Sequence, residues 1–325
     1  MSEKAVESVP TWVRLGAGFV RCLPAGRYRA IERLCRIFCR RQPASFRMGM
    51  SRSLGGHQFI CDLRDSIARE VCFTGRYEPQ ETAVVQAVLK PGMTFVDVGA
   101  NWGYFTLLAA HLVGPSGCVL SLEPDPRLHR ILQMNLTINR LSQVKPFPVA
   151  AAASAGWLTL AGFQESKGNF GLSRVVGDQG CRSQTDGCGG GVERFRVSAR
   201  PLDDVLARAG VATVDLMKMD IEGAEGLALQ GMQQYLSQQR IRRLMLELHP
   251  QQLAEHGQVA SELIRQLRHF GYVSWRIDHS PRANRRTAYQ RRISLREILR
   301  PLEEDRDLDN WPHLLWESPG LESLW

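Results

Sequence analysis

The segment "FVDVGANWGYFTLLAA", residues 95–110, combines residue types that can hold a nucleotide-like ligand. A short apolar run carries Asp97, a turn containing Gly99 and Gly103 follows, and a second apolar run with helical spacing begins after it. A strand that leads into a glycine turn and then a helix brings backbone N–H groups and a helix N-terminus to one point, where a polar ligand can bind. A tight turn without a ligand has the same local pattern, so other residues must decide between the two.

An acid at the end of the next apolar run favours a ligand. Glu123 follows "CVLSL", 26 residues after Asp97, where a carboxylate can accept hydrogen bonds from the two hydroxyls of a ribose. NAD and S-adenosylmethionine both carry such a ribose. A dinucleotide site needs Gly-x-Gly-x-x-Gly, but Asn101 stands where the second glycine would be. Asp97 would repel a pyrophosphate and attract an ammonium group, so the turn favours S-adenosylmethionine.

A second acidic group lies in "VDLMKMDIEGAE", residues 214–225. The period of two along a strand places Lys218 and Asp220 on one side, with Asp220 at the carboxyl end. Ligands bind beyond the carboxyl ends of the strands in open α/β sheets, so Asp220 is a candidate site residue. Glu222 and Glu225 follow in the first turn of an expected helix, where carboxylates stabilise any helix, so each also has a purely structural explanation.

A third group lies in "LMLELHP", where Glu247 and His249 share a face at the end of the neighbouring strand. Asp220, Glu222, Glu247 and His249 can therefore converge. His249 is the candidate general base, because a neutral imidazole near pH 7 can take the proton of an attacking hydroxyl, and Asp220 is the other candidate for this role. The alternative is a histidine that caps the strand end before Pro250. No metal ligand set is predicted, although a divalent metal held by these acids is an alternative to acids that only position substrate.

Apolar runs that fit strands alternate with helical patterns along most of the chain. A strand over residues 57–63 and a turn over 75–81 come before helices over 82–89 and 102–113, a helix from Pro126 behind an Asp125 cap, and a helix from about Glu222. The remaining expected strands are residues 94–99, 118–123, 144–152, 157–163, 214–220 and 241–249. Strands that alternate with helices and are apolar almost throughout indicate an α/β fold, with a parallel sheet covered on both faces.

We expect one domain with extensions. Residues 1–52 form a basic helical extension and residues 53–280 the domain, which contains a flexible, glycine- and serine-rich insertion at 164–193. Residues 281–325 form a C-terminal tail, in which Trp311 and Trp316 either contribute to an acceptor pocket or pack in the structure.

The net charge of +8 belongs to the extension, because residues 1–52 hold eleven basic and three acidic residues and the remaining chain is neutral. No nucleic acid partner is expected for such a neutral body. Residues 27–41 have a helical pattern, with one apolar face and arginines elsewhere. We expect this segment to pack on its own domain, and a peripheral membrane or partner contact is the alternative.

The eight cysteines show no CxxC pair and no zinc spacing, which indicates a reducing cytoplasm, with peripheral contact to the inner membrane face as an addition. No stretch approaches the roughly 18 apolar residues of a transmembrane helix.

Taken together, several motifs resemble the FkbM family of S-adenosylmethionine-dependent methyltransferases. The resemblance runs from about residue 55 to 250. It rests on "GRYEP" at 75–79, "VDVGANWGYFT" at 96–106, "LEPDP" at 122–126, "LDD" at 202–204, "LMKMDIEGAE" at 216–225 and "LELH" at 246–249.

The resemblance implies a Rossmann-like class I methyltransferase fold and methyl transfer to a hydroxyl of a sugar, glycan or natural product. It implies that Asp220 and Glu222 match the family's acidic motif, and with His249 they are the candidate catalytic residues. Tyr77 and Glu78 either close over cofactor or acceptor or form a turn with a packed tyrosine. The S-adenosylmethionine site that it implies comprises Asp97, Gly99, Ala100, Asn101, Gly103 and Glu123.

Three other functions compete with this interpretation. The Lys218 and Asp220 pair and the basic composition suit an RNA 2′-O-methyltransferase, but the body lacks a basic stripe with interleaved aromatics. An NAD-dependent oxidoreductase is disfavoured by the missing second glycine. A cofactor-binding scaffold without turnover is disfavoured by the acids at two adjacent strand ends.

Overall fold

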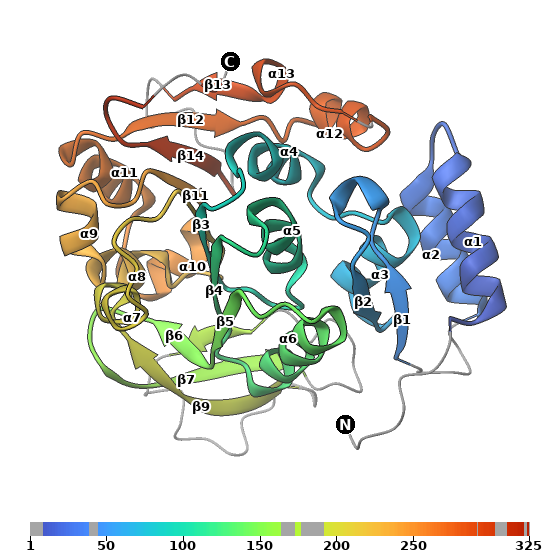
Figure 1. Ribbon diagram of the computed structural model, residues 1–325, viewed down its shortest axis with the longest axis horizontal. Helices are drawn as coiled ribbons and strands as arrows, with labels where there is room; N and C mark the ends of the chain where they lie inside the picture. The colour runs from blue at the N-terminus through green and yellow to red at the C-terminus, as the bar shows by residue number, and fades with distance from the viewer. Residues whose placement is uncertain are drawn as a thin grey trace.

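An eight-stranded sheet runs through the middle of the molecule (Figure 1). The computed structural model describes residues 9–38, 45–163, 173–176, 192–290, 292–302, 311–321 and 324. In spatial order the strands of this main sheet are β13 (Leu299–Pro301), β12 (Val273–Ile277), β14 (His313–Glu317), β11 (Arg243–Glu247), β10 (Leu216–Met219), β3 (Thr94–Val98), β4 (Cys118–Leu122) and β5 (Val144–Phe147). From β11 to β5 the strands pair in parallel.

Helices cover both faces of the main sheet (Figure 1). On one face lie α4 (Pro79–Val88), α5 (Tyr104–Val113) and α6 (Pro126–Asn139), and on the other α8 (Glu225–Gln230), α9 (Gln233–Ser237), α10 (Pro250–Glu255) and α11 (Ala260–His269). Successive residues of a strand enter different cores: Phe95 packs in the first and Val96 in the second. This two-sided burial explains the apolar sequence of the strands and confirms the Rossmann-like α/β fold that the sequence predicts.

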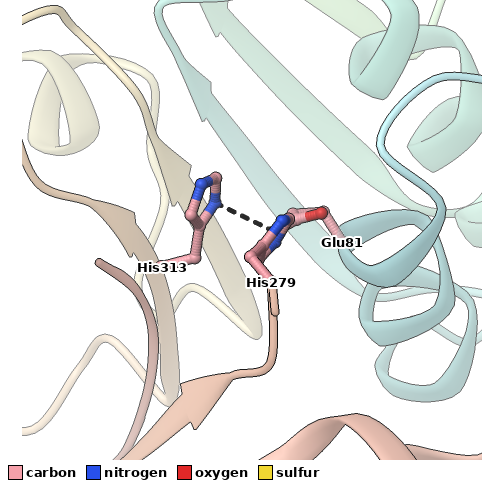
Figure 2. Close-up of side chains that lie close together, drawn as sticks. All are labelled: Glu81, His279 and His313. Carbon is pink, nitrogen blue, oxygen red and sulfur yellow. Dashed lines mark hydrogen bonds and ion pairs between the residues drawn. The ribbon is translucent and has the colours of Figure 1, made fainter. Parts of the chain in front are cut away.

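The C-terminal segment takes part in the main sheet. Residues 281–325, expected as a tail, include α12 (Pro281–Thr287), α13 (Leu295–Ile298), β13 and β14. Strand β14 is antiparallel to both neighbours and lies between β11 and β12, so its first residue is at the edge where the parallel strands end. His279, which follows β12, and His313, which begins β14, therefore meet there with stacked rings (Figure 2). Trp316 is fully buried in the core, whereas Trp311 is exposed.

A smaller sheet lies beside the main one and consists of β6 (Val149–Ala151), β9 (Val192–Arg200), β7 (Gly156–Phe163) and β8 (Arg174–Val176). The single strand expected over 144–152 was wrong, because the chain leaves the main sheet at Pro148, which has no N–H to continue the ladder. The strand expected at 157–163 belongs to the smaller sheet. Most of the expected insertion 164–193 lies outside the described residues, and β8 is a described part of it.

The N-terminal segment packs against the body through α1 (Thr11–Cys22), α2 (Arg27–Phe38), β1 (Phe46–Gly49), a short 3₁₀ helix (Arg52–Leu54), β2 (Gln58–Cys61) and α3 (Ser66–Thr74). Strands β1 and β2 form an antiparallel pair across the expected boundary at residue 52. In α2, Ile31 and Cys35 enter the first core, as expected for a helix that packs on its own domain. A membrane or partner contact by residues 27–41 stays a prediction, and 39–41 lie outside the described residues. None of the described helices is long and apolar enough to cross a bilayer.

Candidate active site

The glycine turn brings the ends of β3 and β10 together. Gly99 has φ +84°, and a Cβ built on it would collide with the backbone carbonyl oxygen of Asp220. Gly103 has φ +86°, and a Cβ there would strike the side chain of Leu132 on α6. Both positions therefore need glycine for conformation and for space. Between them, Asn101 also adopts a left-handed conformation, with φ +53°.

Glu123 lies directly beside this turn, at the end of β4. Its Oε2 accepts a hydrogen bond from the backbone N–H of Asn101 at 2.7 Å, and its Oε1 accepts one from that of Asp125 at 2.8 Å. Burial raises the pKa of Glu123 to about 8 despite these donors. A carboxylate can accept about four hydrogen bonds, so the two backbone donors leave capacity for the ligand side.

A pocket opens in front of Glu123 and is lined by Gly99, Asn101 and Glu123 of the predicted cofactor set. Asp97, Ala100 and Gly103, which the sequence also placed in that set, do not line it. The opposite wall is apolar and comes largely from the smaller sheet and α6: Leu128, Val149, Leu160 and Val175. The sequence did not predict this wall, because it depends on where the smaller sheet docks.

Ser173 and Arg127 tie the smaller sheet to the start of α6. The Ser173 hydroxyl donates to Asp125 Oδ2 at 2.6 Å, and the Arg127 guanidinium pairs with the same carboxylate at 2.6 Å. Arg127 also reaches Glu193 on β9 at 3.2 Å. Asp125 caps α6 by accepting from the Arg127 N–H, as the sequence predicted. One buried carboxylate therefore holds both the helix start and the apolar wall of the pocket.

Asp97 points away from the pocket, into the protein. It is almost fully buried and accepts a 2.6 Å hydrogen bond from the Thr106 hydroxyl of α5. Burial raises the pKa of Asp97 to about 6, against the opposing effects of Lys218 and the Thr106 hydrogen bond. In the structure this acid joins β3, α5 and β10, whereas the sequence interpretation gave it direct contact with a ligand ammonium group.

Lys218 and Asp220 form an ion pair beside Asp97, in which Lys218 is buried and Asp220 is partly exposed. Lys218 Nζ donates to Asp220 Oδ2 at 3.0 Å, lies 3.9 Å from Glu78 Oε2 and lies over the Phe105 ring. Burial alone would raise the pKa of Asp220, but Lys218 outweighs it and lowers that pKa. Asp220 lines the pocket, and Lys218 thus keeps it ionised there.

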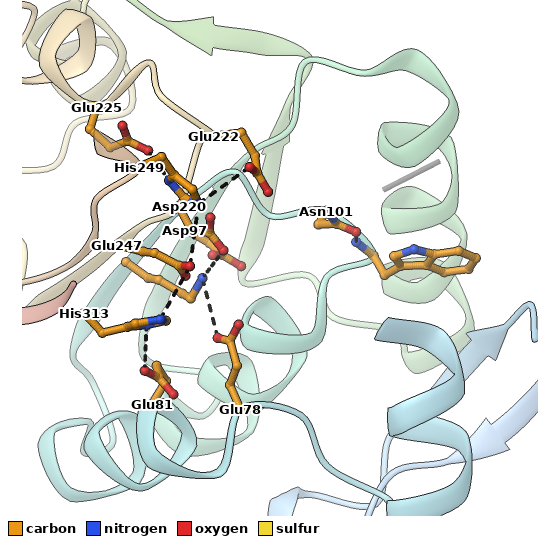
Figure 3. A network of polar contacts seen from close by, with 12 residues as sticks. Glu78, Glu81, Asp97, Asn101, Asp220, Glu222, Glu225, Glu247, His249 and His313 are labelled. Atoms are coloured by element: carbon orange, nitrogen blue, oxygen red, sulfur yellow. Dashed lines mark hydrogen bonds and ion pairs between the residues drawn. The ribbon is translucent and has the colours of Figure 1, made fainter. Parts of the chain in front are cut away.

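His249 lies among three carboxylates, as Figure 3 shows. Its Nδ1 is 2.9 Å from Glu225 Oε1, and its Nε2 is 3.5 Å from Glu222 Oε2 and 3.6 Å from Glu247 Oε1. Burial alone would lower the pKa of His249, but the Glu225 hydrogen bond and the surrounding acids raise it to about 9. His249 is therefore mainly a cation at pH 7, unlike the neutral imidazole expected from the sequence, and it does not line the pocket.

Glu222 and Glu247 do line the pocket, together with Asp220. Burial, followed by repulsion from Asp220, raises the pKa of both carboxyls, that of Glu247 well above its usual range. The structure therefore brings together the four residues that the sequence expected to converge. It also adds Glu225, which accepts from the Gly223 N–H at 3.0 Å and contacts Nδ1 of His249.

Tyr77 and Glu78 lie at the same pocket. Tyr77 packs edge-on against Tyr104 and Phe105, as the packed-tyrosine alternative expects, and that it closes over cofactor or acceptor stays a prediction. Glu78 has φ +41° directly before α4, and burial raises its pKa. Its Oε2 faces Lys218 without a hydrogen-bond partner among the described residues.

The acid network continues beyond the residues that the sequence predicted. His313 Nε2 is 3.5 Å from Glu247 Oε1, and His313 Nδ1 is 3.0 Å from Glu81 Oε1 (Figure 3). Neither Glu81 nor His313 belongs to a motif with diagnostic spacing. A strand assignment for "HLLWE", the sequence of β14, is the signal that could have placed His313 at this edge.

Comparison with known proteins finds similarity to methyltransferases. The family model described as "Methyltransferase FkbM domain" matches residues 97–274, more than half of the chain. Methyltransferase sdnD of Sordaria araneosa is 33% identical over 154 residues, which are 42% of this chain and 59% of sdnD. The 31-O-demethyl-FK506 methyltransferase FkbM of Streptomyces tacrolimicus is 30% identical over 179 residues, 50% of this chain and 67% of that protein.

Among solved structures, the chain is similar to methyltransferase FkbM from Methylobacillus flagellatus KT. The two are 17% identical with a TM-score of 0.41, and the match covers 77% of this chain and 52% of that one. The chain thus spans about half of that protein and about three fifths of sdnD.

Proposed function

The chain belongs to the FkbM family of methyltransferases, and we propose that it transfers the methyl group of S-adenosylmethionine to a hydroxyl oxygen of a sugar, glycan or natural product. The observation that carries this proposal is the position of Glu123. Its carboxylate ends the strand next to the glycine turn, is held by two backbone N–H groups, and faces a pocket with an apolar wall on one side and acids on the other.

The residues present fit the cofactor. Glu123 would accept hydrogen bonds from the ribose hydroxyls, and Gly99 and Asn101 of the turn line the same pocket beside it. The apolar wall suits the adenine. The acidic side of the pocket as a whole favours a cofactor with cationic sulfonium and ammonium groups, whereas it would repel the pyrophosphate of NAD.

Bound S-adenosylmethionine supplies an electrophilic methyl group, and the protein must orient the acceptor hydroxyl and take its proton. We propose Glu222 as the general base that accepts this proton. Its carboxyl lines the pocket, and its raised pKa makes it a better base than an ordinary glutamate. Asp220, held ionised by Lys218, positions the hydroxyl. His249 becomes a positioning residue, since its charged ring lies between Glu222, Glu225 and Glu247.

The choice of acceptor rests on the relatives. The Streptomyces tacrolimicus protein is a 31-O-demethyl-FK506 methyltransferase, so its acceptor is an oxygen of a natural product. An RNA acceptor gains no support from the pocket, because Lys218 is 5% exposed and already pairs with acids.

Mass spectrometry of candidate acceptors incubated with S-adenosylmethionine tests the proposal. We expect one hydroxylated glycoside or macrocycle to gain one methyl group, with formation of S-adenosylhomocysteine. Glu222→Gln should lower kcat about 10²-fold or more, and Glu262→Gln, a change on an exposed side chain, is the matched control. Methylation of a nitrogen, or of RNA in place of these acceptors, would contradict the proposal.

A further inference from the structure

Three side chains of metal-ligand type meet at the carboxyl edge of the main sheet, outside the pocket (Figure 2). Glu81 comes from the first turn of α4, His279 follows β12, and His313 begins β14. Glu81 Oε1 lies 2.6 Å from His279 Nε2 and 3.0 Å from His313 Nδ1. Each of the three residues thus offers one ligand atom to a common point.

The hydrogen bonds do not satisfy this cluster. Glu81 is 1% exposed, and its Oε2 has no hydrogen-bond partner among the described residues. One nitrogen of each imidazole faces Glu81 Oε1, and the two rings stack with 3.9 Å between their centroids. A buried carboxylate oxygen without a partner costs free energy, and a cation bound by both oxygens of Glu81 would remove that cost.

His313 also has the outer contact that is typical of a metal-bound histidine. Such a ligand usually donates its second ring N–H to a carboxylate, which fixes the tautomer. Here Nδ1 faces Glu81, while Nε2 lies 3.5 Å from Glu247 Oε1. With a metal on Nδ1, the proton of His313 would reside on Nε2 and point at Glu247.

The three ligand atoms also lie within 4.8 Å of one another, close enough to reach one ion. Zinc binds imidazole nitrogen and carboxylate oxygen at about 2.0–2.2 Å, so two ligands of one ion lie roughly 3 to 3.5 Å apart. The 3.0 Å between Glu81 Oε1 and His313 Nδ1 is already in this range, whereas the 2.6 Å between Glu81 Oε1 and His279 Nε2 is a hydrogen-bond distance that would lengthen when an ion replaces the proton. His279 borders a surface pocket that Gln80 and Asn284 also line, which gives an ion an entry path.

We propose that Glu81, His279 and His313 form a binding site for one divalent transition-metal ion of the zinc type. Two imidazoles and one carboxylate suit zinc, and three protein ligands leave a coordination position for water. The ion would join α4, the segment after β12 and the start of β14. Because Glu78 lies one turn before Glu81, and Glu247 contacts His313, this clamp would hold two pocket-lining acids in place.

Calorimetric titration of the full-length, tag-free, chelator-treated protein with Zn²⁺ tests the site. We expect one equivalent to bind and the Tm to rise on zinc addition. His279→Ala and Glu81→Gln should each weaken zinc binding by at least ~100-fold, because each removes a ligand. His269→Ala changes an exposed histidine on α11 and should bind zinc as the wild type does.

A His249→Ala variant separates this site from the acids at the pocket, where Asp220, Glu222 and His249 also lie close together. We expect His249→Ala to retain the zinc affinity. Far-UV circular dichroism checks that every variant is folded. Co²⁺ titration followed by absorption spectroscopy gives an independent signal, which we expect in the wild type and not in His279→Ala. No zinc binding by the wild type would overturn the proposal, as would binding that survives His279→Ala and is lost in His249→Ala.

Discussion

The backbone carbonyl oxygen of Asp220 occupies the space that a side chain on Gly99 would need. This close approach places the end of β10 against the glycine turn after β3. It also brings the acids after β10 to the same pocket as Glu123. The cofactor side and the acidic side of the pocket are thus built on one backbone contact.

Gly99→Ala should break this contact. The variant needs a left-handed conformation for alanine and collides with Asp220, so we expect the free energy of unfolding to fall by about 2 kcal/mol or more. Urea denaturation measures the change. Gly18→Ala on α1 is the matched control, because a Cβ there meets no atom within 4 Å and should raise helix stability by about 0.5–1 kcal/mol. Equal stabilities of Gly99→Ala and the wild type would show that the turn is not constrained.

Glu123→Gln should change how cofactor affinity depends on pH. The pKa of Glu123 in the free pocket is about 8, and ribose hydroxyls bind best to the ionised carboxylate, so binding below that pH requires loss of a proton. We expect the affinity for S-adenosylhomocysteine to rise by up to about tenfold per pH unit from roughly pH 6 to 8. Calorimetry on both proteins should show this slope only in the wild type, and the same slope in Glu123→Gln would contradict the role of Glu123.

Lys218→Met should leave Asp97, Asp220 and Glu78 without their shared cation. Uncompensated buried charge typically costs about 3–5 kcal/mol, so we expect a loss of that size in the free energy of unfolding at pH 7. The loss should shrink toward pH 5, where these carboxyls take up protons. The double variant Lys218→Met/Asp220→Asn should recover part of the stability, and a double variant no more stable than Lys218→Met would contradict the ion pair.

Titration of His249 should report its carboxylate surroundings. Its pKa in the folded protein is about 9, above the unfolded value of about 6.5, so its charge stabilises the fold fully below pH 6.5 and this contribution is lost as pH rises through 9. NMR should show one histidine with a midpoint above pH 8, assigned by its absence in His249→Asn. In Glu225→Gln that midpoint should fall, and a midpoint near 6.5 in the wild type would restore His249 as a candidate base.

Local patterns predicted the strands that are buried on both faces, because such strands are apolar almost throughout. Runs 94–99, 118–123 and 214–220 contain β3, β4 and β10. The same patterns missed the antiparallel insertion of β14, because a five-residue strand carries no signal for its neighbours. The departure of the chain from the main sheet at Pro148 was also missed, because residues 144–152 form one apolar run that does not show which sheet each part joins.

The candidate site was predicted as far as it depends on strand ends. Asp220, Glu222, Glu247 and His249 end or follow two neighbouring strands, so their convergence could be inferred. The charge of His249 could not, since it depends on Glu225 on α8. The cluster of Glu81 and His313 could not be inferred either, because it requires the position of β14.

Calorimetric titration with S-adenosylhomocysteine, and separately with NAD, tests the central claim most directly. We predict that the wild type binds one equivalent of S-adenosylhomocysteine and no NAD. Glu123→Ala should bind about 10²-fold more weakly, because two hydrogen bonds to a charged group are lost, while Glu262→Ala, at an exposed side chain, should be unchanged. Binding of NAD, or S-adenosylhomocysteine affinity that is the same in Glu123→Ala, would contradict the account.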